Sequence, residues 1–245
     1  TVEQPTIGDV FDAVSRGDAA YGVVPVENST EGCVTHTLDM FADTDLKICA
    51  ELNLAIHHCL LSPLETTEIE VLYSHSQVFG QCRRWLQRNM PAARLIEVSS
   101  TTEATARCLR EPRSGALASA LAAERYGVPI RASKIEDSTD NTTRFLILGR
   151  QSPAPTGDDK TSLLMAIRHR VGALYDSLLP FGKHGVNLTF IESRPSKRRN
   201  WEYYFFIDFV GHVTEERVQA MLEELGEHCQ FIKILGSYPR AGDSR

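Results

Sequence analysis

The organisation of the chain is decided by one stretch, which reads Arg150-Gln-Ser-Pro-Ala-Pro-Thr-Gly-Asp-Asp159. Two prolines, a glycine and short polar side chains neither continue a helix nor supply apolar surface to a core. The stretch therefore predicts a linker at residues 150–160. It separates a first part, residues 1–149, from a second part, residues 161–245.

The second part has short elements with clear patterns. Apolar or β-branched runs predict four strands, at 161–169, 186–193, 201–210 and 229–237. Apolar residues at helical spacing predict two helices, at 172–184 and 214–226. In chain order these elements read β-α-β-β-α-β, which is the ferredoxin-like arrangement. Two helices cover one face of such a sheet, and we expect its other face or an edge to meet a partner subunit.

The first part repeats strand-then-helix units. Strands are predicted at 20–26, 48–60, 69–73, 94–98, 114–118 and 143–148. Helices are predicted at 8–16, 34–41 and 78–86, from Ser100 onward, and in an alanine-rich segment that ends at Gly127. This repetition predicts an α/β fold with a parallel, doubly wound sheet, in which ligands bind at the carboxyl ends of strands. The strand at 48–60 is long enough to cross between two lobes.

Composition excludes several classes of protein. The chain has 245 residues, which is enough to bury a sizeable core, and 42% of them are hydrophobic. A net charge of −6 argues against a broad nucleic-acid-binding face, with Lys197-Arg198-Arg199 the one dense basic run. No apolar run is long enough to span a membrane. The six cysteines form no zinc-type spacing, so we expect no metal, reduced thiols and a cytoplasmic protein.

Polar side chains gather next to three of the predicted strands. Glu27-Asn28-Ser29 and Ser74-His75 each follow a strand, and Asp140-Asn-Thr-Thr-Arg144 leads into one. A helix that begins after a strand presents unpaired N–H groups and the positive end of its dipole, which suits a small carboxylate-bearing molecule. Taken alone, each place is better explained as a capped helix or a turn. No phosphate loop, nucleophile elbow or zinc-protease motif is present, so spacing alone names no reaction.

These same residues lie in stretches that resemble the signature stretches of the prephenate dehydratase family. They are Val24-Pro-Val-Glu-Asn-Ser-Thr-Glu-Gly32, Tyr73-Ser-His-Ser-Gln-Val-Phe-Gly-Gln-Cys82 and Asn141-Thr-Thr-Arg-Phe145. Gly172-Ala-Leu174 and Glu192-Ser-Arg-Pro195 resemble the phenylalanine-binding stretches of the ACT regulatory domain that follows it. Gly157-Asp-Asp-Lys-Thr-Ser162 resembles the bifunctional chorismate mutase–prephenate dehydratases of bacteria. The stretches occur in the family's order and span nearly the whole chain.

The resemblance implies a particular fold. It is a two-lobed, doubly wound catalytic domain of the periplasmic-binding-protein type, followed by a ferredoxin-like ACT domain. The family's Gly-rich first stretch has no counterpart in residues 1–14, so we expect the first lobe to be N-terminally incomplete. Ser76 stands where many members have proline, and serine is a good residue for a helix start.

The resemblance also implies a reaction, in which prephenate loses CO₂ and water to give phenylpyruvate without a cofactor or metal. Hydroxide is a poor leaving group, so the reaction needs an acid or a strong hydrogen-bond donor. By resemblance, Thr143 is the hydroxyl nearest the leaving group. The other residues implied to be catalytic are Asn28, Ser74 and Gln81. Those implied to bind substrate are Glu27, Ser29, His75, Arg144 and Phe145.

Three of these roles have alternatives. Arg144 pairs either with a substrate carboxylate in forked geometry, or with Glu27 or another structural acid. His75 acts either as a proton carrier or as a cap of the following helix. If that helix begins at once, Gln81 shares a helix face with Ser74, because seven residues make two helical turns.

For the second part, the resemblance implies feedback inhibition by L-phenylalanine. The implied effector residues are Gly172, Ala173, Leu174, Glu192, Ser193, Arg194 and Pro195. Gly172 lets the backbone approach the ligand, Ala173 and Leu174 offer N–H groups to its carboxylate, and Glu192 takes its ammonium group. We expect a homodimer or homotetramer, because the strand edge near Glu192–Pro195 and the aromatic strand at 201–209 are more apolar than one small module can cover.

Other functions remain open at this point. Arogenate replaces prephenate as the substrate in one alternative, and in another the chain is a catalytically weak phenylalanine-sensing fragment. A two-lobed solute-binding protein has a similar architecture, but the cysteines and the attached second part argue against it. Turnover of prephenate separates an enzyme from both binding proteins, and no nucleic-acid or membrane partner is expected.

Overall fold

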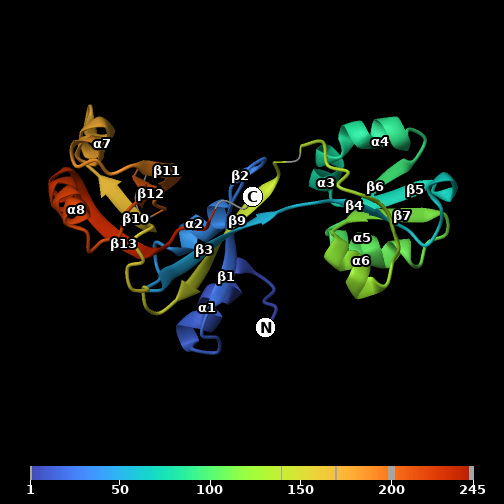
Figure 1. The fold of residues 1–245 in the computed structure, drawn as a ribbon, viewed down its shortest axis with the longest axis horizontal. Helices are drawn as coiled ribbons and strands as arrows, with labels where there is room; N and C mark the ends of the chain where they lie inside the picture. The colour runs from blue at the N-terminus through green and yellow to red at the C-terminus, as the bar shows by residue number, and fades with distance from the viewer. Residues whose placement is uncertain (1, 139, 169, 198–201, 243–245) are drawn as a thin grey trace. The chain divides into compact units, whose positions relative to one another are not determined.

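A computed structural model describes residues 2–138, 140–168, 170–197 and 202–242 (Figure 1). The chain divides into a first unit, residues 1–54 with 143–245, and a second unit, residues 55–142. The linker expected at 150–160 lies inside the first unit, and the domain boundaries drawn there stay a prediction. In the described part of the chain, no helix combines the length and the apolar character needed to cross a membrane.

The first unit begins with a four-stranded sheet and two helices. Their bounds are α1 Ile7–Arg16, β1 Gly22–Asn28, β2 Gly32–Cys33, α2 Thr35–Met40, β3 Lys47–Ala55 and β9 Thr142–Gly149. The strand order is β2-β1-β9-β3, and β1 runs antiparallel to both neighbours. Helix α1 begins with a capping box between Thr6 and Asp9, and Gly17 ends it in the left-handed conformation that glycine tolerates.

The C-terminal module, residues 159–239, has the β-α-β-β-α-β order predicted from the sequence. Its elements are β10 Asp159–Ile167, α7 Ala173–Lys183, β11 Leu188–Pro195, β12 Tyr203–Val210, α8 Glu216–His228 and β13 Cys229–Pro239. The strand order is β11-β12-β10-β13 with antiparallel neighbours. Leu163 and Met165 pack with α7 and α8 on one face of this sheet.

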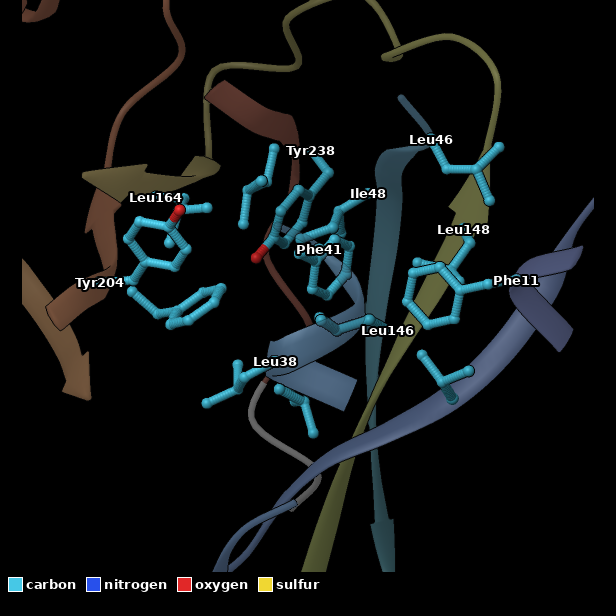
Figure 2. Close-up of a cluster of buried hydrophobic side chains, with 14 of the residues drawn as sticks. Phe11, Leu38, Phe41, Leu46, Ile48, Leu146, Leu148, Leu164, Tyr204 and Tyr238 are labelled. Carbon is cyan, nitrogen blue, oxygen red and sulfur yellow. The ribbon is translucent and has the colours of Figure 1, made fainter. Parts of the chain in front are cut away.

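The other face of the module's sheet is covered by the same chain. The aromatic strand β12 places Tyr204 and Phe206 in a core that also holds Phe11 and Phe41 of the N-terminal elements. Figure 2 shows this shared core, with these residues labelled: Phe11, Leu38, Phe41, Leu46, Ile48, Leu146, Leu148, Leu164, Tyr204 and Tyr238. A partner subunit is therefore not needed to bury this face, and self-association stays a prediction that rests on the edge strand β11.

The second unit contains a five-stranded sheet and four α-helices within its described residues. The elements are β4 Cys59–Leu61, η1 Thr66–Glu68, β5 Val71–Ser74, α3 Ser76–Gln81, α4 Arg83–Asn89, β6 Arg94–Glu97, α5 Thr101–Cys108, β7 Ser114–Ala118, α6 Ala120–Tyr126 and β8 Ile130–Ser133. The strand order is β6-β5-β7-β4-β8. Strand β5 is parallel to β6 and β7, whereas β4 is antiparallel to β7 and β8.

The expectation of a parallel, doubly wound sheet is therefore only partly correct. Strands that helices connect run in one direction, because a crossover helix returns the chain to the same end of the sheet. Strand β4 enters this unit directly from β3 with no helix in between, and it lies between β7 and β8 in the opposite direction. The prediction of a single long strand at 48–60 is also wrong. The strand is broken at 56–58, where the N–H of His58 donates to the Glu136 carboxylate at 2.9 Å.

Candidate active site

Asn28 and Thr143 face each other across two strands of the first unit. Asn28 ends β1 and lies opposite Thr143 in the register of β1 and β9. The side-chain amide nitrogen Nδ2 of Asn28 donates to Oγ1 of Thr143 at 2.8 Å. The pairing shifts by one residue between Pro25 and Glu27, and a bulge of this kind re-aims the side chains that follow it. The sequence thus placed both residues correctly at the end of one strand and the start of another.

The orientation of the Asn28 amide is determined by its other contacts. Its Oδ1 accepts hydrogen bonds from Thr30 N at 3.0 Å, Thr30 Oγ1 at 2.6 Å and Glu31 N at 3.1 Å. Because all three groups are donors, the amide oxygen must face them and the amide nitrogen must face Thr143. A hydroxyl that accepts from Asn28 keeps its own proton to donate elsewhere. The proton of the Thr143 hydroxyl is therefore not used in its hydrogen bond with Asn28.

Arg144 lies beside Thr143 on β9, and its guanidinium group is buried. Nε lies 2.7 Å from Glu51 Oε2, Nη1 lies 2.6 Å from Asp208 Oδ2, and Nη2 donates to the Tyr238 hydroxyl at 3.1 Å. Burial alone would lower the pKa of Arg144, but the charges of Asp208 and Glu51 raise that pKa above its usual range. Of the two alternatives for Arg144, this geometry favours the structural ion pair, with Glu51 and Asp208 rather than Glu27 as partners.

The remaining candidates of the first unit lie on β1, on β9 and in the loop that follows β1. Glu27 is half-buried and lies opposite Cys33 of β2 in the strand register. Ser29 is exposed in the loop that follows β1, and Phe145 is half-buried opposite Pro25.

In the second unit, Ser74 and Gln81 lie on different elements. Ser74 ends β5 and is fully buried, and its hydroxyl donates to the Leu117 carbonyl oxygen at 2.8 Å. Helix α3 begins at Ser76 and not directly at Ser74, so the condition under which Ser74 and Gln81 would share a helix face is not met. The strand continues to Ser74 because this residue still pairs with Glu97 of β6.

Gln81 is held by His58 and Asn141, to which the sequence assigned no individual catalytic or binding role. Its Oε1 accepts from Asn141 Nδ2 at 3.1 Å and lies 2.6 Å from Nε2 of His58. The backbone N–H of His58 donates to Glu136, and Nδ1 of His57 lies 2.7 Å from the same carboxylate. Burial raises the pKa of Glu136, but these contacts outweigh burial and lower it. A role for Asn141 could have been predicted from the sequence, because this residue belongs to the same signature stretch as Thr143.

His75 has the geometry of a helix cap. It is the N-cap residue of α3, and its Nδ1 accepts from the backbone N–H of Gln77 at 3.4 Å. The imidazole rings of the adjacent His57 and His58 contact different side chains, those of Glu136 and Gln81. Within the described ranges, His, Cys, Asp and Glu side chains form no group of three or more suited to a metal ion.

The candidate effector residues divide between two faces of the C-terminal module. Gly172 precedes α7 with φ +78°, and the N–H of Ala173 donates to the Arg170 carbonyl oxygen at 3.2 Å. On β11, Glu192 and Arg194 are half-buried, whereas Ser193 and Pro195 are exposed. Arg194 binds Asp39 of α2 with two hydrogen bonds, of 3.0 and 3.1 Å.

Glu192 lies near the thiol of Cys33 in β2. Burial raises the pKa of that thiol to about 11, and the negative charges of Glu192 and Glu27 add to the rise. Of the two charged residues of this stretch, Arg194 thus already has a partner in α2.

Comparison with known proteins decides the family. The family model described as prephenate dehydratase matches residues 1–153. The chain belongs to the prephenate dehydratase family. The resemblance drawn from the signature stretches is therefore confirmed.

Relatives and solved structures agree with this assignment to the prephenate dehydratase family. A bifunctional chorismate mutase/prephenate dehydratase of Aquifex aeolicus is 51% identical over 237 residues, covering 96% of this chain and 66% of the relative. A prephenate dehydratase of Amycolatopsis methanolica is 38% identical, covering 98% of this chain and 80% of the relative. The crystal structure of Arthrobacter aurescens prephenate dehydratase in complex with L-Phe is 34% identical with a TM-score of 0.89, covering 98% of this chain and 81% of that one. The chain thus spans slightly less than two thirds of the Aquifex relative.

In this member of the prephenate dehydratase family, the ion pair of Asp39 predicts a pH-dependent stability. The hydrogen bond from Arg194 is the largest cause that lowers the pKa of Asp39. A carboxyl whose pKa is lower in the folded state stabilises that state above its unfolded pKa, about 3.9, and the stabilisation is lost as the pH falls through the folded value. Asp39→Asn should therefore lower the free energy of unfolding by about 1 kcal/mol at neutral pH.

Urea unfolding at pH 7 and in acid measures this difference. The gap between wild type and Asp39→Asn should shrink as the pH falls below about 4. Asp12→Asn, at an exposed residue of α1, is the control and should change stability little. A gap of equal size at both pH values would show that the Asp39 carboxylate does not stabilise the fold through its charge.

Proposed function

We propose that this chain is a prephenate dehydratase, which converts prephenate to phenylpyruvate with loss of CO₂ and water. Two observations support the proposal. The chain belongs to the prephenate dehydratase family, and Asn28 holds the Thr143 hydroxyl so that its proton is available to donate. The proposed mechanism rests on the second observation, the hydrogen bond between Asn28 and Thr143.

The reaction needs few groups from the protein. The bond from the ring to the leaving carboxylate breaks, and its electron pair enters the ring as CO₂ departs. The ring becomes aromatic as the bond to the 4-hydroxyl breaks, and that oxygen leaves as water after it gains a proton. Positioning of the substrate and one donor at the hydroxyl are therefore sufficient, with no nucleophile or redox group.

Thr143 is the group we assign to the leaving hydroxyl. A threonine hydroxyl is a weak acid, so it acts as a hydrogen-bond donor or as the last member of a proton relay. Asn28 orients this hydroxyl, because the Nδ2 atom of its amide faces the Thr143 oxygen. The roles of Ser74 and Gln81 in catalysis, and of Glu27, Ser29, His75 and Phe145 in substrate binding, stay predictions. Arg144 is not assigned to the substrate, because Glu51 and Asp208 pair with its guanidinium group.

We also propose that L-phenylalanine inhibits the enzyme through the C-terminal module acting as an ACT domain. The β-α-β-β-α-β order of the module supports this, as does the L-Phe complex formed by the Arthrobacter relative. The start of α7 at Gly172–Leu174 is the proposed site for the effector carboxylate, because a helix N-terminus favours an anion. Coupling of about 1–3 kcal/mol between effector and substrate would give roughly 5–150-fold inhibition.

Steady-state kinetics with the purified chain tests the proposal. Prephenate should be converted to phenylpyruvate, and L-phenylalanine should inhibit without simple competition against prephenate. Arogenate, in which an amino group replaces the keto group, is the comparison substrate and should give a lower kcat/KM. Absence of phenylpyruvate formation in the wild-type chain would reject the proposed activity, and a higher kcat/KM for arogenate would reassign the substrate.

A further inference from the structure

A buried cluster of charges lies on the far side of β9 from Thr143. Arg144 contacts Glu51 and Asp208, and the Nζ atom of Lys160 lies 2.9 Å from Glu51 Oε1. The exposed fractions of these side chains are 12% for Arg144, 3% for Glu51, 8% for Asp208 and 14% for Lys160. Two positive and two negative charges balance each other, so loss of any one leaves a buried charge without compensation.

The cluster joins the C-terminal module to the strand that carries Thr143. Arg144 and Glu51 lie on β9 and β3, whereas Asp208 and Lys160 lie on β12 and β10 of the module. Asp208 is itself held in place, because it accepts a hydrogen bond from Ser162 Oγ at 2.5 Å. The module thus contributes a fixed carboxylate to the guanidinium group next to Thr143.

Arg144 and Thr143 are neighbours on a strand, so their side chains point to opposite faces of the sheet. The direction of both side chains depends on the same stretch of backbone at residues 143–144. The strand register places Thr143 opposite Asn28 and Arg144 opposite Glu27. The contacts that hold Arg144 on one face of β9 therefore act on the same backbone that carries Thr143 toward Asn28.

We propose that Asp208 is a positioning residue for catalysis, which orients Thr143 by holding Arg144 from the opposite face of β9. The inference rests on the proposed function, because it takes Thr143 as the proton donor. It adds that the C-terminal module takes part in turnover itself, with or without an effector bound.

The test is a double-mutant cycle in kcat for phenylpyruvate formation. Asp208→Asn should lower kcat about tenfold with little change in KM, because a small misplacement of the donor slows the reaction step. In the Thr143→Val background, Asp208→Asn should cause no further loss, because the group that it positions is already gone. An equal loss in both backgrounds, or an unchanged kcat in the Asp208→Asn single variant, would overturn the proposal.

Two further variants distinguish an effect on catalysis from a general loss of folding. Asp159→Asn replaces another buried aspartate of the module, which bonds Thr156 and Gly157, and kcat should stay near that of wild type. Tyr238→Phe removes only the hydroxyl that bonds Arg144 and Ser162, and should give a smaller loss of kcat with the same non-additivity. If Asp208→Asn does not fold, Tyr238→Phe decides the question by the same cycle. A wild-type chain without phenylpyruvate formation would instead reject the proposed function.

Discussion

Thr143→Val should lower kcat for phenylpyruvate formation by about a hundredfold, the scale typical of losing a general acid or a key donor. Valine has nearly the volume of threonine but no hydroxyl, so the shape of the site changes little. Thr143 is half-buried and its oxygen is fixed by Asn28 at 2.8 Å, so a water molecule would have to replace both its position and its orientation. KM should change much less than kcat, because the proton is needed when the leaving hydroxyl departs.

Thr143→Ser is the matched control for this prediction. Serine retains the hydroxyl and can still accept from Asn28 Nδ2, so most of kcat should remain. Steady-state rates of the two variants, measured at saturating prephenate, separate loss of the hydroxyl from loss of the methyl group. Similar kcat values for Thr143→Val and wild type would remove Thr143 from the mechanism.

Gly236→Ala should destabilise the first unit by about 2–3 kcal/mol, within the range for overpacking a close contact. Gly236 lies on β13 of the C-terminal module, where the added Cβ would collide with the carbonyl oxygen of Ile48 and lie 2.9 Å from its nitrogen. Both atoms belong to the backbone of β3, so no side-chain rotation relieves the contact. The strand must move, which opens the core that the module shares with Ile48 and Phe41.

Gly226→Ala makes the same chemical change, but it should raise the free energy of unfolding instead of lowering it. Gly226 lies within α8, and apart from its chain neighbours and the backbone of its own helix no described atom lies within 4 Å of its added Cβ. Alanine should stabilise this helix by about 0.5–1 kcal/mol, because glycine loses more backbone entropy on folding. Urea unfolding followed by circular dichroism measures both variants. Equal stability of Gly236→Ala and wild type would show that β13 and β3 are not in close contact.

Much of the local structure follows from the sequence alone. The alternating and helical patterns of residues 161–237 determined the β-α-β-β-α-β order, because apolar periodicity reflects which side of each element is buried. The same holds for α1 and for α6, which ends at Gly127. The stretches around Asn28 and Thr143 were identified because strand ends carry polar residues there, and these two residues do meet.

Tertiary structure decided how these parts are paired and packed. Sequence patterns show that a face is apolar but not what covers it, so Tyr204 and Phe206 suggested a partner subunit although residues such as Phe11 and Phe41 of the same chain bury them. The direction of the strands could not be predicted from the sequence either, because no residue pattern in β4 indicates that it pairs antiparallel with β7.

The role of Arg144 shows the same division most clearly. The sequence by itself determined that an arginine follows Thr143 and that it would seek a carboxylate, since a guanidinium group is charged at any physiological pH. It left open a substrate carboxylate or a structural acid. The choice depended on Glu51 and Asp208, which lie 93 and 64 residues away in the sequence and reach Arg144 only once β3, β9 and β12 are assembled. Long-range ion pairs of this kind have no local sequence pattern, so only the folded chain reveals them.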